Sequence, residues 1–357
     1  MPTQLASRDE LPAEFLDQLS GHDVAPIWPA MRNILPYGRP IRHTVPHLWR
    51  YRELRPLLMQ AGELTPVEKA ERRVLMLSNP GLGGQPFATA SIFFGLQLLL
   101  PGEVAPSHKH SVGAVRLIVE GEGASTTIGD ECCPMEKGDV ILTPPGRWHQ
   151  HQHQGQGPMV WLDALDAPVV IGTEASYCIE GTLQSVSAQP DASQTHFRRS
   201  GLIPYDTLAH ATDDYPLLRF PWSDVRVALD DLAAAAAPNE PVQLAYVNPE
   251  TGRECMRIHG FSALMLRPGE TLSRPRRSAC NGYLVVEGTG ETEIDGTTLK
   301  WEDNDVFVAP THADISHRNT SSTAPAFLIQ VDDAPLQRNL GFYEEFPADT
   351  GPLRVLR

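Results

Sequence analysis

Residues 102–121 read GEVAPSHKHSVGAVRLIVEG, and residues 138–153 read GDVILTPPGRWHQHQH. They contain two histidines one residue apart, His108 and His110, and a later histidine, His149. Because residues i and i+2 of a strand project from the same face, the first two histidines offer two imidazoles side by side. A third imidazole from another strand would complete a facial triad and leave the opposite metal positions open. The two segments therefore predict a divalent-metal site suited to chemistry rather than to structure.

Length, charge and cysteine content narrow the class of protein. The chain has 357 residues, of which 41% are hydrophobic and 20% are charged, and this suits two packed domains. The formal net charge of −15 argues against nucleic acid and anionic membranes as partners. No apolar run approaches the roughly 18 residues of a membrane span, and the first residues lack the order of a signal peptide. The five cysteines include no CxxC pair, so we expect free thiols and a cytoplasmic location.

The segment before the histidines is expected to be an N-terminal arm, residues 1–90. Its pattern predicts an amphipathic helix over residues 8–20, followed by an extended proline-rich stretch. A second helix is expected from His47 to Ala61, ending at Gly62. A third helix would begin after Thr65 and carry two arginines, Arg72 and Arg73.

From residue 91 onward the pattern changes to short strands separated by Gly, Pro and Asp. Residues 91–176 are expected to form one β-barrel, and residues 256–357 a second. The intervening residues 177–255 read as a linker, polar at first and then helical over residues 224–237. The fold class is therefore mainly β, with two tandem barrels.

The second strand-rich block repeats the first. Gly269 aligns with Gly102, Gly288 with Gly121, Asp305 with Asp139 and Pro310 with Pro144. A duplication of this length is hard to explain by chance. At the positions of the three histidines the second copy has Pro275, Arg277 and Ile315, none of which can bind a metal. We therefore expect one metal site per chain, and we expect His312 and His317 to be packing or surface residues.

The first copy resembles the cupin pattern. Its first motif is matched by Gly102, His108, His110 and Gly121, and its second by Gly138, Pro144, Gly146 and His149. This resemblance selects His149 rather than His151 as the third ligand. The usual cupin glutamate is missing at Ala114 or Val115, so the site has three neutral imidazoles and favours an anionic bidentate substrate. The ligand set alone does not separate Fe(II) from Zn(II), Mn(II), Ni(II) or Cu(II).

The wider sequence around the histidines resembles the gentisate 1,2-dioxygenase family. The resemblance rests on GLQLLLPGEVAPSHKH, on Arg116 six residues after His110, on TPPGRWHQH and on PMVWLDALD. It implies a bicupin homotetramer with one Fe(II) per chain. Such enzymes use O2 to open a small aromatic acid between its carboxyl- and hydroxyl-bearing carbons, so gentisate, salicylate and substituted salicylates are all candidate substrates.

The resemblance also implies roles for individual residues. Arg116 would hold the substrate carboxylate, because a guanidinium binds a carboxylate in a bidentate manner. Gln97 would hydrogen-bond substrate or oxygen, His151 would act as an acid or base, and Asp163 would orient one of these groups. Arg72 or Arg73 would lie at the pocket mouth. Phe93 stands where the family often has tryptophan, Gly113 is expected to enlarge the pocket, and His153 is expected to lie in a loop.

Each assignment has an alternative that the sequence leaves open. Arg116 could be a surface residue, Gln97 a buried amide satisfied by the backbone, and His151 a structural hydrogen-bonding group. The same barrel could also host a metal-dependent isomerase or decarboxylase, which needs no O2, or a binding protein for aromatic acids that has no activity. Oxygen uptake separates the dioxygenase from both.

Overall fold

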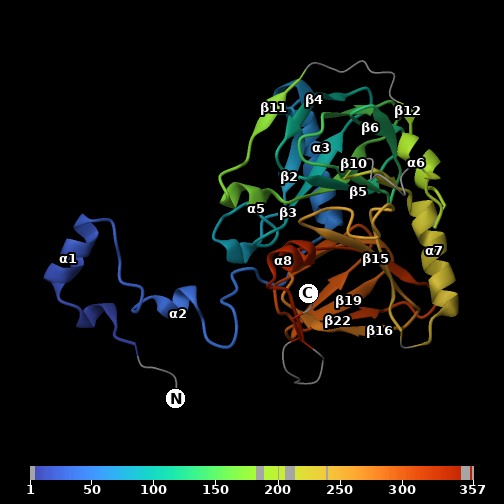
Figure 1. Ribbon diagram of the computed structural model, residues 1–357. Coiled ribbons are helices and arrows are strands. Elements are labelled where there is room, and N and C mark those ends of the chain that lie inside the picture. The colour runs from blue at the N-terminus through green and yellow to red at the C-terminus, as the bar shows by residue number, and fades with distance from the viewer. Residues whose placement is uncertain are drawn as a thin grey trace. The chain divides into compact units, whose positions relative to one another are not determined.

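The computed structural model describes residues 5–181, 189–199, 201–205, 214–238, 240–346 and 354–355. The chain divides into two compact units, Met1–His43 and Thr44–Arg357 (Figure 1). Of the described helices, none combines the length and the apolar character that crossing a membrane requires.

The N-terminal unit consists of short helices that bury no side chain. It contains η1 (Arg8–Glu10), α1 (Ala13–Gly21) and α2 (Met31–Ile34). The helix expected over residues 8–20 is therefore divided, because Leu11 and Pro12 adopt extended backbone angles between η1 and α1. Large apolar side chains of this unit, including Leu35 and Tyr37, remain exposed.

The segment before the first barrel differs from the expected pair of helices. Residues at the start of the expected second helix form strand β1 (His47–Trp49), and helix α3 (Tyr51–Leu64) continues through Gly62. The third helix is a single turn, α4 (Val67–Ala70), which ends where Glu71 takes a positive φ of 52°. Strand β2 (Arg73–Met76) follows directly, and then the short helix η2 (Pro80–Leu82). The prediction that both arginines lie on a helix is therefore wrong, because α4 ends at Ala70, Arg72 lies between α4 and β2, and Arg73 begins the strand.

Two six-stranded sheets build the first barrel. One has the order β13-β8-β5-β10-β3-β2, and the other has the order β11-β4-β9-β6-β7-β12. Neighbouring strands are antiparallel except β12 and β7. The strands, besides β2, are β3 (Phe93–Leu99), β4 (Val104–His110), β5 (Ala114–Glu120), β6 (Ala124–Ile128), β7 (Glu131–Met135), β8 (Val140–Thr143), β9 (His149–His153), β10 (Met159–Leu165), β11 (Cys178–Glu180), β12 (Gln189–Pro190) and β13 (Arg219–Phe220).

The second barrel repeats this arrangement with a six-stranded and a four-stranded sheet. Their orders are β1-β21-β18-β23-β15-β14 and β16-β22-β19-β20, and a small sheet β17-β24-β25 lies beside them. The strands, besides β1, are β14 (Val242–Ala245), β15 (Gly260–Leu266), β16 (Thr271–Arg274), β17 (Arg276–Arg277), β18 (Asn281–Glu287), β19 (Gly290–Ile294), β20 (Thr297–Trp301), β21 (Val306–Ala309), β22 (Ile315–Asn319), β23 (Ala326–Asp332), β24 (Glu344–Phe346) and β25 (Arg354–Val355).

The two barrels share turn contacts as well as strands. Before β8, Asp139 Oδ2 accepts a hydrogen bond from the Glu136 backbone N–H at 3.2 Å. Before β21, Asp305 Oδ2 accepts the same bond from Glu302 at 3.1 Å. Such side-chain-to-backbone bonds hold a tight turn in place. The duplication seen in the sequence is therefore also a duplication of local structure.

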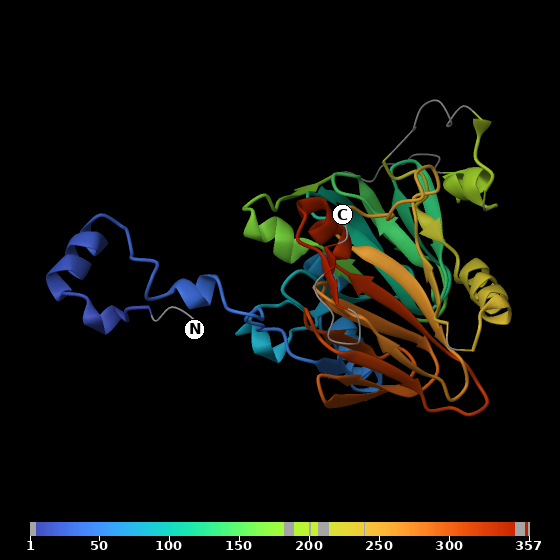
Figure 2. The same cartoon turned by 60° about the horizontal axis from the view of Figure 1, so that its bottom comes forward.

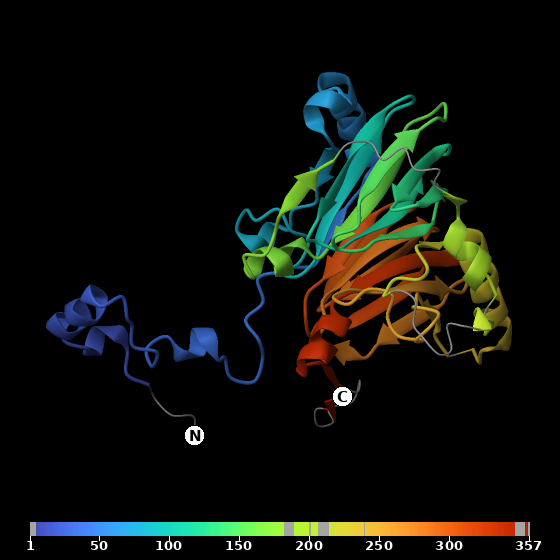
Figure 3. The same cartoon turned by 45° about the horizontal axis from the view of Figure 1, so that its top comes forward.

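Four further helices connect and flank the barrels: α5 (Ala167–Gly172), α6 (Ala192–Phe197), α7 (Trp222–Ala235) and α8 (Ala334–Leu340). The two strand blocks lie against each other, with α7 alongside both (Figures 2 and 3). One continuous hydrophobic core includes residues of both blocks, such as Phe94 and Phe327. The Phe94 ring of the first block also packs against the backbone of the second, because a Cβ added to Gly282 would lie 2.4 Å from that ring. The expected linker is partly built into the barrels, since β11, β12 and β13 extend the first one and β14 extends the second.

Candidate active site

The three predicted ligand histidines meet inside the first barrel. His108 and His110 project from β4, and His149 begins β9 directly opposite His108. The ring centroids of His108 and His149 are 4.0 Å apart, and those of His110 and His149 are 4.8 Å apart. The ligand atoms of all three lie within 4.8 Å of one another. The H-x-H spacing and the strand pairing together produce the facial triad.

The protonation of His110 and His149 fits a divalent metal. His110 Nδ1 contacts the Val112 carbonyl oxygen at 2.6 Å, and His149 Nδ1 contacts the Arg147 carbonyl oxygen at 3.0 Å. Each Nδ1 therefore carries the proton, and each Nε2 keeps its lone pair. His149 Nε2 is buried without a hydrogen-bond partner. Burial lowers the pKa of His108 to about 2 and that of His110 to about 4, so both imidazoles are neutral.

The triad opens into a cavity of about 320 Å3. Two cations, Arg72 and Arg116, and one carboxyl group, Asp163, face this cavity. The remaining wall is largely apolar, and the full lining consists of Arg72, Val74, Met76, Phe93, Gln97, His108, His110, Ala114, Arg116, Asp163, Leu165 and Cys178. Neutral metal ligands beside two guanidinium groups make this a site for an anion with an apolar body.

Arg116 is a buried cation held by three side chains. It donates to Thr143 Oγ1 through Nη1 and to His151 Nε2 at 3.1 Å through Nη2. Its Nε lies 3.6 Å from Asp163 Oδ1. Burial lowers the pKa of Arg116 to about 10, with Asp163 opposing that shift, so the guanidinium keeps its charge at neutral pH. Arg116 is therefore not a surface residue, and its orientation is fixed.

The contacts of His151 determine its tautomer. Arginine can only donate, so His151 Nε2 accepts the bond from Arg116. Burial, with Arg116 nearby, lowers the pKa of His151 well below its ordinary value and keeps the ring neutral. Its proton is then on Nδ1, which donates to Thr126 Oγ1 at 2.9 Å, and the Thr126 hydroxyl donates onward to Met135 Sδ at 3.3 Å. His151 thus lies behind Arg116 and is fully buried.

Three other predicted residues lie at the cavity. Gln97 is buried on β3, and its Nε2 has no hydrogen-bond partner among the described residues, so a donor is left for a ligand. Phe93 lines the same wall. Arg72 lines the cavity and contacts His108 Nδ1 and the Pro106 carbonyl oxygen. The choice between the two neighbouring arginines therefore falls on Arg72.

Three expectations are wrong in detail. Arg73 points away from the cavity and binds Glu103 and the Gly62 carbonyl oxygen, because successive residues of β2 face opposite ways and Val74 faces the cavity. Gly113 is not part of the cavity wall, since its N–H donates to Asp166 Oδ1 at 2.8 Å and a Cβ there would lie 2.9 Å from Asp166 Oδ2. His153 is not in a loop, because it is the buried last residue of β9 and contacts the Gly157 carbonyl oxygen at 2.5 Å.

Sequence reasoning missed part of the wall. Val74 and Met76 come from β2, which we expected to be the end of a helix. Cys178 comes from β11, which pairs with β4 so that Cys178 lies opposite His110. That strand lies in the stretch that reads as a polar linker. Two edge strands too short to show a pattern therefore supply the outer wall.

The second barrel has no triad among its described residues. Arg277 donates to Asn281 Oδ1 at 2.7 Å, and Ile315 is buried at the start of β22. His317, which matches His151 in the repeat, is fully buried and contacts Thr292 Oγ1 at 2.9 Å through Nδ1. His317 is thus a packing residue, as expected. The expectation of one histidine metal site per chain agrees with this geometry.

Comparisons with known proteins agree with the fold and the site. Residues 95–165 match the family model described as "Cupin domain". A gentisate 1,2-dioxygenase of a Ralstonia species is 47% identical over 96% of this chain and 97% of its own length. A 5-aminosalicylate 1,2-dioxygenase of a Comamonas species is 35% identical over 87% and 84%. The crystal structure of salicylate 1,2-dioxygenase from Pseudoaminobacter salicylatoxidans with gentisate superposes with a TM-score of 0.90, at 29% identity and 98% coverage of each chain.

Two tandem cupin barrels with a histidine triad in the first define a bicupin metalloprotein. The chain belongs to the gentisate 1,2-dioxygenase family and is a ring-cleaving aromatic dioxygenase. The resemblance seen in the sequence is thus confirmed.

Proposed function

We propose that this chain opens the ring of gentisate or a closely related salicylate with Fe(II), one ion per chain, at the His108, His110 and His149 triad. The observation that carries the proposal is the neutral triad beside Arg116 in a single cavity, in a chain 47% identical to a gentisate 1,2-dioxygenase. Fe(II) bound there would supply open coordination positions and the redox chemistry that O2 requires. Both atoms of O2 enter the product, which is a ring-opened oxo-diacid.

In this proposal, the protein orients and neutralises the substrate. Arg116 binds the carboxylate, and Arg72 adds a second positive charge near the cavity mouth. Gln97 donates its unpaired N–H to a substrate oxygen or to O2, and Phe93 contacts the ring face. Asp163 and His151 hold the Arg116 guanidinium from two sides, so it is ordered before substrate arrives. The apolar part of the cavity wall limits the contact of the bound ring with water.

The geometry favours a positioning role for His151. Its Nε2 accepts from Arg116 and its Nδ1 proton is directed to Thr126, so neither ring nitrogen faces the cavity with a free proton. An acid or base role would require Arg116 to give up that hydrogen bond when substrate binds. We propose that His151 acts mainly through Arg116.

Oxygen consumption tests the activity. Enzyme reconstituted with Fe(II) is given gentisate, salicylate, 5-aminosalicylate and 1-hydroxy-2-naphthoate in an oxygen electrode, with product followed by ultraviolet absorbance. We expect one O2 consumed per ring opened, with gentisate giving the highest kcat/KM. Turnover of any of these acids without O2 uptake would instead indicate an isomerase or decarboxylase.

We also propose a cytoplasmic homotetramer. The support for association between chains is the N-terminal unit, which buries no helical side chain yet exposes Trp28, Leu35 and Tyr37. Exposed apolar groups of this size mark contact surfaces. Light scattering after gel filtration should give four chains per particle, and removal of residues 1–43 should lower that number.

A further inference from the structure

The second barrel contains a cavity at the place equivalent to the active site. This cavity has a volume of about 450 Å3, compared with about 320 Å3 for the active-site cavity. Its wall includes β14, β15 and β23, and the active-site wall includes β2, β3 and β10. Gln243 lies opposite Leu264 as Val74 lies opposite Gln97, and Gln330 lies opposite Ser262 as Asp163 lies opposite Gly95. Duplication has therefore preserved the cavity while changing the side chains that line it.

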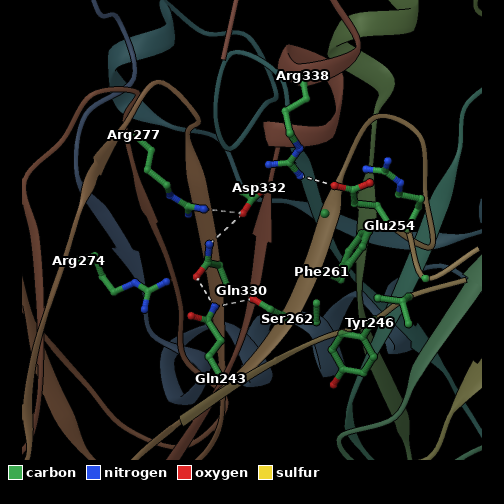
Figure 4. A pocket seen from close by; sticks show the side chains of 15 residues that line it. Gln243, Tyr246, Glu254, Phe261, Ser262, Arg274, Arg277, Gln330, Asp332 and Arg338 are labelled. Atoms are coloured by element: carbon green, nitrogen blue, oxygen red, sulfur yellow. Dashed lines mark hydrogen bonds and ion pairs between the residues drawn. The ribbon is translucent and has the colours of Figure 1, made fainter. Parts of the chain in front are cut away.

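The polar floor of this second cavity is held by a chain of hydrogen bonds (Figure 4). Gln243 Nε2 donates to Ser262 Oγ at 2.7 Å and to Gln330 Oε1 at 3.1 Å. Gln330 Nε2 donates to Asp332 Oδ2 at 3.0 Å. Since the amide donors are used within the floor, the cavity is ordered without a ligand, and the floor supplies no free amide N–H for recognition.

The charges of the cavity do not cancel. Arg338 pairs with Glu254, and Arg277 Nη1 lies 3.4 Å from Asp332 Oδ2. Arg274 also lines the cavity, and Figure 4 shows its side chain directed toward Gln330 and Gln243. Among the described residues, no hydrogen bond or ion pair engages the Arg274 guanidinium. Burial lowers the pKa of Arg274 and Arg277 adds to this shift, while Tyr283, Glu345 and Asp332 oppose it in part. A half-buried cation beside another cation is stabilised by an anion.

The rest of the wall limits what that anion can be. Ala245 and Val247 line the cavity together with the edges of Tyr246 and Phe261, whose side chains are otherwise packed in the hydrophobic core, and this apolar part of the lining accommodates a ligand with an apolar body. Two carboxylates, Glu254 and Asp332, also line the cavity and disfavour a multiply charged anion such as phosphate. A metal ion is disfavoured by the arginines. Charge and shape together therefore match a small organic monocarboxylate.

We propose that the second barrel binds a small organic monocarboxylate with an apolar body, anchored by Arg274, at a site separate from the metal centre. This assignment uses the cavity, the unpaired guanidinium and the apolar part of the lining, and does not depend on the reaction of the first barrel. It gives the barrel without metal ligands a binding role of its own.

Isothermal titration with benzoate tests the proposal, because benzoate has a carboxylate and an apolar ring but no ortho hydroxyl. The Fe(II)-loaded full-length enzyme should bind benzoate at two sites per chain, and Arg274→Ala should bind it at one. Arg116→Ala should remove the other site, and the double variant should bind none. A single arginine–carboxylate contact makes the expected loss of affinity at the second site at least about tenfold.

Controls separate this effect from misfolding. Arg318→Ala removes an exposed arginine of the same barrel and should leave both benzoate sites unchanged. Arg274→Ala should keep wild-type oxygen uptake in the absence of benzoate. If Arg274→Ala does not fold by circular dichroism, Ser262→Leu fills the cavity floor without removing a charge and should also abolish the second site.

Two results would overturn the proposal. One is an unchanged benzoate stoichiometry in folded Arg274→Ala or, where that variant does not fold, in Ser262→Leu. The other is displacement of benzoate from the second site by inorganic phosphate at an equal concentration. This would mean that the cavity binds anions by charge alone and does not select an apolar body.

Discussion

The two barrels contain cavities at equivalent positions but differ in the side chains that each gathers there. The first has three neutral imidazoles, a fixed arginine and an apolar wall. The second has arginines and amides, with Arg277 and Ile315 at two of the ligand positions. The turn aspartates Asp139 and Asp305 make the same backbone contact in both. The comparison teaches that the residues that specify the barrel fold differ from those that line its cavity. The lining can therefore be altered without loss of the fold.

Removal of a metal ligand should have the largest effect. His108→Ala leaves two imidazoles in the triad, and an open site with two neutral ligands holds a divalent ion poorly. We expect loss of bound iron and a fall in kcat of at least about 100-fold, since even outer-shell changes at metal sites cost about 10- to 100-fold. Iron is measured by inductively coupled plasma mass spectrometry. His196→Ala, an exposed histidine on α6, should keep full iron and activity.

Retention of iron with normal turnover in His108→Ala would mean that the ligand set is wrong. His317→Ala tests whether a buried histidine of the second barrel contributes to iron binding. It should lower stability, because His317 is fully buried, but leave the iron content at one per chain.

Arg116→Lys should have the next largest effect. Lysine keeps the charge but loses the planar donor set that reaches Thr143 and His151 and leaves one point of contact for a carboxylate. A lost charged hydrogen bond is worth about 2–3 kcal/mol, so kcat/KM for gentisate should fall roughly 30- to 150-fold. Steady-state oxygen uptake measures this value. Arg277→Lys changes a half-buried arginine of the second barrel and should change kcat/KM by less than about twofold.

A matched pair of threonines should separate stability from activity. Thr126 accepts from His151 Nδ1 and Thr292 contacts His317 Nδ1, each at 2.9 Å. Valine at either position removes the hydroxyl and leaves a buried N–H without an acceptor, which costs about 1–3 kcal/mol of stability. In Thr126→Val the proton of His151 can move to Nε2, where it opposes the Arg116 donor. We therefore expect kcat/KM to fall about 10- to 30-fold, as for other outer-shell changes.

Thr292→Val should lose at least as much stability as Thr126→Val, because Trp301 Nε1 also donates to Thr292 at 2.9 Å. Its activity should stay at the wild-type level, since His317, unlike His151, does not hydrogen-bond to an arginine of the active site. Equal losses of activity in both variants, measured beside denaturant unfolding curves, would show that His151 does not act through Arg116.

The sequence predicted the metal site better than it predicted the pocket around it. Two histidines at i and i+2 lie on one strand face, so two ligands followed from local pattern, and the resemblance to the cupin pattern selected His149 as the third. The tautomer of His151 depends on Thr126 and Arg116 from other strands, and no local pattern encodes it. The edge strands β2 and β11 are four and three residues long. Their pairing, rather than their own propensity, makes them strands, so Val74 and Cys178 were missed.

The smallest expected effect comes from a glycine at the base of the active-site cavity. Gly95 in the first barrel corresponds to Ser262 in the second, where a side chain is tolerated and takes part in the polar floor. A Cβ on Gly95 would lie 2.5 Å from Val74 Cγ1 and 2.9 Å from the Phe93 ring, so Gly95→Ala must displace both cavity residues. The pocket should narrow by about one methyl group, which is worth roughly tenfold in discrimination between acids of different size.

Competition between gentisate and 1-hydroxy-2-naphthoate measures that discrimination as a ratio of kcat/KM values. Gly95→Ala should move the ratio toward the smaller acid, and Ser262→Ala should leave it unchanged, because the second cavity does not contact the substrate ring. A ratio unaltered by Gly95→Ala would mean that Val74 and Phe93 move aside without changing the space for the ring. The wall would then be set by the backbone of β2 and β3 and not by the packing of these two side chains.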